Sequence, residues 1–130
     1  MGMFDSMNIS ASGLTAHRLW MDVISSNLAN AESTRSADGG PFRRQMMVLA
    51  SDSDKGVKVE SVTPDPTPMR QVYDPGHPDA DANGMVSYPN VDPVREMVDM
   101  LTASRAFEAN AVAMSTSKAM LLRALEIGKS

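Results

Sequence analysis

All eight prolines of this 130-residue chain lie in its middle, between Pro41 and Pro93. Proline does not fit a helix interior, because its ring removes a backbone hydrogen bond and clashes with the preceding turn. Long helices are therefore expected only in the two flanking segments, while the middle is restricted to turns and short strands. We predict three parts: an N-terminal helix in residues 1–33, a β-hairpin and proline-rich loop region in 34–91, and a C-terminal helix in 92–130.

Large apolar side chains in the N-terminal segment recur every seven residues, which is the heptad pattern of packed helices. This pattern predicts a helix from about residue 4 to residue 30. One row comprises Met7, Leu14, Met21 and Leu28, and a second comprises Ile9, Ala16, Trp20 and Ile24. Together the rows form a surface wider than one partner helix covers.

The same spacing recurs in the C-terminal segment and predicts a second helix from Pro93 to about residue 127. Asp92 followed by Pro93 is typical of a helix start, because Asp caps free backbone N–H groups and proline fits the first helical position. The main row comprises Met100, Phe107, Met114 and Leu121, and a neighbouring row comprises Met97, Ser104, Ala111, Lys118 and Leu125. The two helices would be roughly 40 and 50 Å long, so we expect an elongated molecule.

Short strands are expected between the helices, at residues 43–50, 57–63, 69–73 and 85–88. The second of these runs alternates apolar and charged side chains, which is typical of a strand. A turn signal at residues 54–56 (DKG) separates the first two runs. The predicted fold is therefore mainly α, with long N- and C-terminal helices forming a coiled-coil-like bundle and a small β-hairpin and loop region between them.

Neither predicted helix has the charged outer face of an ordinary surface helix. Residues 1–31 contain only three charged side chains and residues 106–122 only two, and small Ser, Ala, Gly and Asn residues stand in their place. The pattern favours faces that pack closely against other helices in an assembly. With a single partner such a helix is marginally stable, so we expect the chain ends to fray in the free subunit and to fold on assembly. The alternative is a loosely specified helix pair in a monomer.

The composition argues against several classes of function. The chain has no cysteine and only two histidines, His17 and His77, which excludes disulfides, thiolate metal sites and multi-histidine metal sites. A net charge of -4 argues against nucleic acid as a partner. No catalytic or phosphate-binding motif occurs, so we expect neither enzymatic activity nor a cofactor. We also expect no cleaved leader and no transmembrane segment, because no apolar run approaches about 20 residues.

Residues 79–84 (DADANG) match the opening of a helix-flanked calcium-binding loop. The match then fails, because the twelfth position is Asn90 where a bidentate Glu is needed, and Pro75 and Pro78 prevent the incoming helix. Asp and Asn also favour turns through side-chain to backbone hydrogen bonds. We therefore predict a turn here without a metal ion, and keep a calcium-dependent binding module as an alternative function.

Two segments near opposite ends of the chain, residues 25–30 (SSNLAN) and 102–110 (TASRAFEAN), resemble the signatures of the bacterial flagellar rod and hook family. Residues 39–45 (GGPFRRQ), 77–81 (HPDAD) and 88–92 (YPNVD) make the chain most similar to the proximal members of the flagellar basal-body rod. The resemblance covers nearly the whole chain. The Pro-Gly-Tyr sequence common to other members is missing after the first signature segment.

This resemblance implies a structural subunit of the bacterial drive shaft, whose terminal helices build the tubular wall and transmit torque for motility. It also implies passage through the flagellar type III export apparatus without cleavage, and assembly in the periplasm as part of the basal-body rod. The implied partners are further copies of the chain, other proximal rod subunits and FliE. No catalytic residue follows from the resemblance. A secreted helical adaptor is a further alternative of a different class.

The candidate site is consequently an interface, and a head-to-tail interface that does not close into a ring would generate a filament. The candidate residues are Met7, Leu14, Trp20, Met21, Ile24, Asn27, Leu28, Asn30, Met97, Met100, Arg105, Phe107, Glu108, Met114 and Leu121. The apolar members are expected to form the contact surfaces. We expect Asn27 and Asn30 to cap or cross-link the end of the first helix, and Arg105 and Glu108 to make polar contacts between helices.

Overall fold

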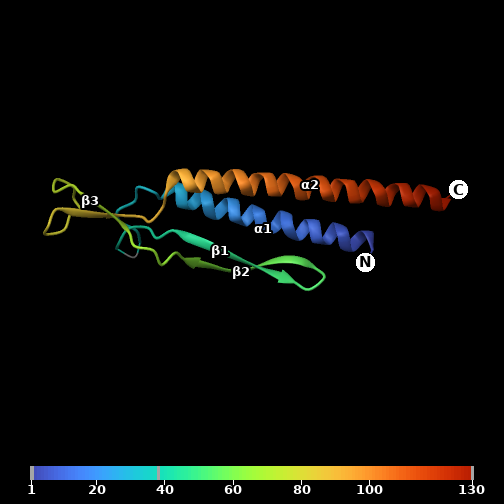
Figure 1. Cartoon of the computed structure of the whole chain (residues 1–130), viewed down its shortest axis with the longest axis horizontal. Helices are drawn as coiled ribbons and strands as arrows, with labels where there is room; N and C mark the ends of the chain where they lie inside the picture. Colours follow the sequence, from blue (N-terminus) through green and yellow to red (C-terminus); the bar gives the residue numbers. More distant parts are fainter. Residues whose placement is uncertain (1, 38, 130) are drawn as a thin grey trace.

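The computed structural model describes residues 2–37 and 39–129, and shows an elongated molecule with two long helices side by side (Figure 1). Helix α1 spans Met3–Ala29 and helix α2 spans Pro93–Lys129. The helices run antiparallel, so the N- and C-terminal ends of the chain lie at the same end of the molecule (Figure 1). The fold is mainly α with a small β region between the helices, which confirms the predicted fold class.

The helix ends lie close to the positions that the sequence signals indicated. The Asp92 carboxylate accepts the backbone N–H of Val94 at 3.1 Å and caps the start of α2. At the end of α1, the Asn30 side chain donates to the carbonyl of Ser26 at 2.8 Å. Helix α2 continues beyond residue 127 to Lys129. Over the part of the chain that the structure describes, neither helix has a stretch long and apolar enough to cross a bilayer.

The middle of the chain forms two separate antiparallel pairs of strands. Strand β1 (Gln45–Asp52) pairs with β2 (Gly56–Pro64), and β3 (Arg70–Tyr73) pairs with β4 (Met85–Tyr88). The β1–β2 hairpin lies along α1, on the side that faces away from α2 (Figure 1), and it packs against α1. The β3–β4 pair lies at the end of the molecule opposite the chain ends (Figure 1).

The tip of the β1–β2 hairpin contacts α1 closely. Gly56 has a φ of 101°, and a Cβ atom there would collide with the Ser12 hydroxyl. The same hydroxyl accepts the backbone N–H of Val57 at 3.1 Å and donates to the carbonyl of Ile9 at 2.6 Å. Glycine is therefore favoured at this position for two reasons: the backbone has a positive φ, and there is no space for a side chain.

The most buried residues of the two helices are mainly small or polar. They are Ser10, Gly13, Ala16, Ile24 and Asn27 on α1, and Glu96 and Ala103 on α2. At Gly13 the helices approach so closely that an added Cβ atom would lie 2.6 Å from the Asn110 side chain. The predicted row of large apolar residues from Met7 to Leu28 is only half-buried. Close approach of the backbones leaves room for small side chains and displaces the large ones to the flanks.

The structure corrects the predicted neighbouring row of α2. That row was expected to include Met97, but Met97 is 60% exposed. The row that accompanies Met100, Phe107, Met114 and Leu121 lies one position earlier in the sequence, and comprises Glu96, Ala103, Asn110 and Ser117. Hydrophobic spacing alone favours the apolar Met97 over the charged Glu96, and burial of Glu96 depends on a partner elsewhere in the chain.

Near the chain ends the two helices are incompletely covered. The Ser6 and Ser117 hydroxyls are 3.2 Å apart, and α2 continues from there past the start of α1 (Figure 1). Phe4 on α1 is 66% exposed and Ile127 on α2 is 76% exposed. We call residues 4–9 and 118–129 the open end of the helix pair.

Candidate assembly interface and polar clamp

The structure divides the predicted interface residues into two groups. The first group is buried or half-buried within the single chain, and comprises Met7, Leu14, Trp20, Met21, Ile24, Asn27, Leu28, Asn30, Met100, Phe107, Met114 and Leu121. The second group, Met97, Arg105 and Glu108, is exposed on α2. The first group thus contributes to packing inside the subunit, whereas the second is accessible to a partner.

Between residues 94 and 125, helix α2 also carries eight large apolar side chains that the single chain leaves more than half exposed. We call these residues the outer apolar set: Val94, Met97, Val98, Leu101, Val112, Met120, Leu122 and Leu125. Scattered exposed apolar residues are normal on proteins. A set of eight on one helix is instead typical of a surface that another protein covers.

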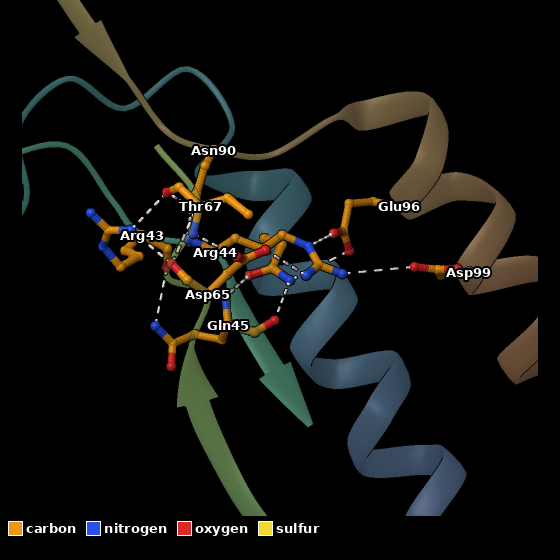
Figure 2. A network of polar contacts seen from close by, with 9 residues as sticks. Arg43, Arg44, Gln45, Asp65, Thr67, Asn90, Glu96 and Asp99 are labelled. Atoms are coloured by element: carbon orange, nitrogen blue, oxygen red, sulfur yellow. Dashed lines mark hydrogen bonds and ion pairs between the residues drawn. The ribbon is translucent and has the colours of Figure 1, made fainter. Parts of the chain in front are cut away.

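At the end of the helix pair opposite the open end, residues far apart in the sequence form a polar network around Arg44 (Figure 2). Arg44 immediately precedes β1, and its guanidinium bonds to the Glu96 carboxylate on α2. The same guanidinium lies 3.0 Å from the Asp65 carboxylate after β2, and 3.9 Å from Asp99 on α2. Figure 2 shows it extending from the strand side toward Glu96 and Asp99.

Two asparagines complete this network. Asn27 of α1 is 1% exposed, accepts the backbone N–H of Gln45 at 2.9 Å, and donates to the Gln45 carbonyl at 3.0 Å and to Glu96 at 3.4 Å. Asn90, between β4 and α2, accepts the backbone N–H of Arg44 at 2.8 Å and donates to the Asp65 carbonyl at 3.1 Å. We call Asn27, Arg44, Asp65, Asn90 and Glu96 the polar clamp. It joins both helices to the base of the β1–β2 hairpin.

The charges of the clamp stabilise one another. Burial alone lowers the pKa of Arg44, but the hydrogen bond and charge of Glu96, followed by those of Asp65, raise that pKa above its ordinary value. The backbone N–H of Thr67, 2.9 Å from the Asp65 carboxylate, lowers the pKa of Asp65. The Thr67 hydroxyl and Arg44 add to this lowering, against the opposing effect of burial. The guanidinium of Arg44 therefore lies between the acidic side chains of Glu96 and Asp65, bonded to both.

Comparison with known proteins matches both helices to flagellar rod sequences. The family described as "Flagella basal body rod protein" matches residues 7–35, and "Flagellar basal body rod FlgEFG protein C-terminal" matches residues 82–127. The flagellar basal-body rod protein FlgC of Bacillus subtilis is 45% identical over 150 aligned positions, covering 99% of this chain and 100% of the relative. This chain belongs to the FlgC family of flagellar basal-body rod proteins.

Other members of the FlgC family are similarly close. FlgC of Salmonella typhimurium is 42% identical over 134 positions, covering 99% of this chain and 100% of the relative. FlgC of Aquifex aeolicus is 43% identical over 135 positions, covering 99% of each chain. The resemblance found in the sequence is thus confirmed. Membership of the FlgC family makes the protein a structural subunit of the basal-body rod of the bacterial flagellum.

The two signature segments of this FlgC-family chain each contain residues that the helix pair buries. Residues 25–30 contain the clamp residue Asn27 and the helix-capping Asn30. Residues 102–110 contain Ala103, which is fully buried, and Asn110, which lies against Gly13. The signatures thus mark close contacts within the subunit.

The calcium-like motif forms the turn that the sequence predicted. The Asp81 carboxylate accepts the backbone N–H groups of Asn83 at 2.8 Å and Met85 at 2.9 Å. Asp79 instead accepts hydrogen bonds from the Thr34 hydroxyl at 2.7 Å and from the Arg35 guanidinium. Both contacts lower the pKa of Asp79, and the contact with Thr34 has the larger effect. Among the described residues no three His, Cys, Asp or Glu side chains cluster as metal ligands would. The match to the FlgC family does not favour the calcium-dependent alternative.

Sequence reasoning missed four of the five clamp residues, namely Arg44, Asp65, Asn90 and Glu96. A signal for Glu96 was present, because it lies seven residues before Ala103 and hence on a row that the helix pair buries. A charged residue at a buried heptad position requires a partner. No local pattern identifies that partner as Arg44, since the pairing spans 52 residues of sequence.

Proposed function

We propose that this chain is a mechanical subunit of the proximal rod, which polymerises through faces of its helices and thereby transmits torque. The outer apolar set of α2 is the observation that carries the proposal, because the described part of the chain leaves each of its members more than half exposed. Membership of a rod family supplies the setting in which neighbours would cover it. Assembly would remove exposed apolar area of this kind from water, and each Å² buried would contribute about 25 cal/mol of favourable free energy.

We further propose that the predicted interface residues act at two levels. The half-buried rows around Leu14 and Phe107 hold α1 and α2 together and present their remaining exposed area to neighbours. Met97, Arg105 and Glu108 contact neighbouring subunits directly. In this proposal the N-terminal helix (1–33) and the C-terminal helix (92–130) are the two segments that assemble with neighbours. The β-hairpin and loop region (34–91) is the part between them that lies beside the helix pair.

The proposed partners are further copies of the chain, other proximal rod subunits and FliE. Delivery through the flagellar type III export apparatus to an assembly site in the periplasm fits a long, thin subunit whose cross-section is a helix pair and a hairpin. No catalytic activity is proposed. The charged groups of the clamp are held in hydrogen bonds and ion pairs, which is typical of a structural network.

The proposal is tested by placing charge in the outer apolar set. In cells that lack their own copy of the gene, the double variant Val112→Asp/Leu125→Asp is compared with the wild-type chain for swimming and for complete rods in isolated basal bodies. Both positions are exposed, so the purified variant should keep the wild-type helix content and unfolding midpoint. We expect loss of rods and of swimming, because the charges must be buried without partners on assembly.

Ser53→Asp is the matched control, because it adds one negative charge at an exposed position in the turn of the β1–β2 hairpin. Cells with this variant should swim. Complete rods and full swimming of the double variant would contradict the proposal. A double variant that accumulates normally but forms no rods would support it.

A further inference from the structure

Glu96 poses a physical problem for the pairing of the two helices. It lies in the first turn of α2 and is 1% exposed, packed toward α1. An ionised carboxylate is tolerated away from water only when it is paired and hydrogen-bonded. Its contact from α1 is the Asn27 amide at 3.4 Å, which is a long hydrogen bond from a neutral group. The two helices alone therefore do not satisfy the charge.

The cation that satisfies Glu96 comes from the β region. Arg44 immediately precedes β1, and its backbone N–H is held by Asn90 at 2.8 Å. Its guanidinium is shared with Asp65, which follows β2. The next residue, Gln45, exchanges two hydrogen bonds with Asn27. Arg44 thus reaches Glu96 only when the base of the hairpin is seated against α1.

We propose that Arg44 is a positioning residue that makes hairpin docking and closure of the helix pair one cooperative event. This event takes place at the end of the helix pair that contains the polar clamp, which we call the clamped end. When the hairpin base leaves α1, Glu96 loses its cation and the first turns of α2 separate from α1. When the hairpin is seated, both elements are fixed. A contact on the hairpin surface is thereby coupled to the spacing of the helices, which goes beyond the helix-face assembly proposed above.

The coupling is tested by hydrogen exchange with mass spectrometry on the full purified chain carrying Arg44→Met. We expect amide exchange to accelerate by about tenfold or more both in the hairpin and in residues 93–103, because removing one partner of a buried pair destabilises everything packed on it. Arg43→Met is the matched control. Arg43 binds the carbonyls of Asp65 and Thr67, and no hydrogen bond or ion pair joins it to α2 among the described residues, so residues 93–103 should exchange at the wild-type rate.

A second variant separates coupling from general loss of structure. In Arg44→Met/Glu96→Met no buried carboxylate remains between the two helices, and the helices should close without the hairpin. We expect residues 93–103 to return to within about threefold of the wild-type exchange rate while the hairpin stays fast. Two results would overturn the proposal: acceleration confined to the hairpin in Arg44→Met, or failure of the double variant to restore residues 93–103. Neither result bears on the outer apolar set, so the assembly proposal is tested independently.

Discussion

The two ends of the helix pair solve the same packing problem in opposite ways. At the clamped end, Ile24, Asn27 and Glu96 are each 1% exposed, and the base of the β1–β2 hairpin supplies the polar partners of Asn27 and Glu96. At the open end, by contrast, Phe4 is 66% exposed and Ile127 is 76% exposed. The sequence argument expected both chain ends to fold on assembly. Both chain ends lie at the open end (Figure 1), where this stays a prediction, whereas the clamped end has its polar groups paired within the single chain.

The largest expected effect contrasts one residue type at the two ends. Ile24→Ala should lower the free energy of unfolding of the free subunit by about 2–5 kcal/mol, because it leaves a cavity at a buried position. Ile127→Ala should change it by no more than about 0.5 kcal/mol, because Ile127 is mostly exposed. Urea unfolding of both variants measures the difference. Equal costs would mean that the two ends do not differ in packing.

The next effect is a pH dependence of the free energy of unfolding, which arises from Asp65 at the clamped end. The pKa of Asp65 is lower in the folded chain than in the unfolded one, so its ionised form stabilises the fold above the unfolded value of about 3.9. That contribution is lost as pH falls through the folded pKa. Asp65→Asn should therefore cost about 1 kcal/mol at pH 7, from weakened hydrogen bonds with Thr67 and Arg44. Urea unfolding curves measured over a series of pH values test this prediction. The difference in free energy of unfolding between Asp65→Asn and the wild-type chain should shrink toward zero at acid pH. A difference that does not change with pH would refute a stabilising role of the ionised Asp65.

The smallest effect compares the two glycines inside the helices. Alanine normally stabilises a helix relative to glycine by about 1 kcal/mol. At Gly13 the new methyl group would meet Asn110, and we expect the overpacking to outweigh the propensity and give a net loss of about 1 kcal/mol. At Gly128 an added methyl group would meet nothing within 4 Å among the described residues beyond the neighbouring helix backbone, so alanine should be neutral or stabilise by up to about 0.5 kcal/mol. Thermal unfolding measures both, and stabilisation by Gly13→Ala would show that the helices can separate there at no cost.

The elements of this fold could be predicted from local patterns, because proline placement and heptad spacing are local properties. Both helices and all four strands form within a few residues of their expected bounds, and Asp92 caps α2 as expected. The closest contacts could not be predicted in the same way. Large apolar residues dominate the heptad pattern, but the backbones meet at Gly13, where a large side chain does not fit.

The polar clamp shows a second limit of sequence reasoning. Arg44, Asp65 and Glu96 lie in three segments separated by turns and strands, and only the folded chain brings them together. Each looks like an ordinary surface charge when taken alone. Heptad spacing identifies Glu96 as buried only after the row containing Ala103 is known to face inward.

The central claim is that the clamped end is ordered in the free subunit and that neighbours complete the open end. Hydrogen exchange of the full chain, measured once as free subunit and once in assembled rods, tests this claim directly. We expect strong protection of residues 20–28 and 96–106 in both states, and protection of residues 4–9 and 118–129 only after assembly. Equal protection of both ends in the free subunit, or an open end that exchanges at the same rate before and after assembly, would contradict it.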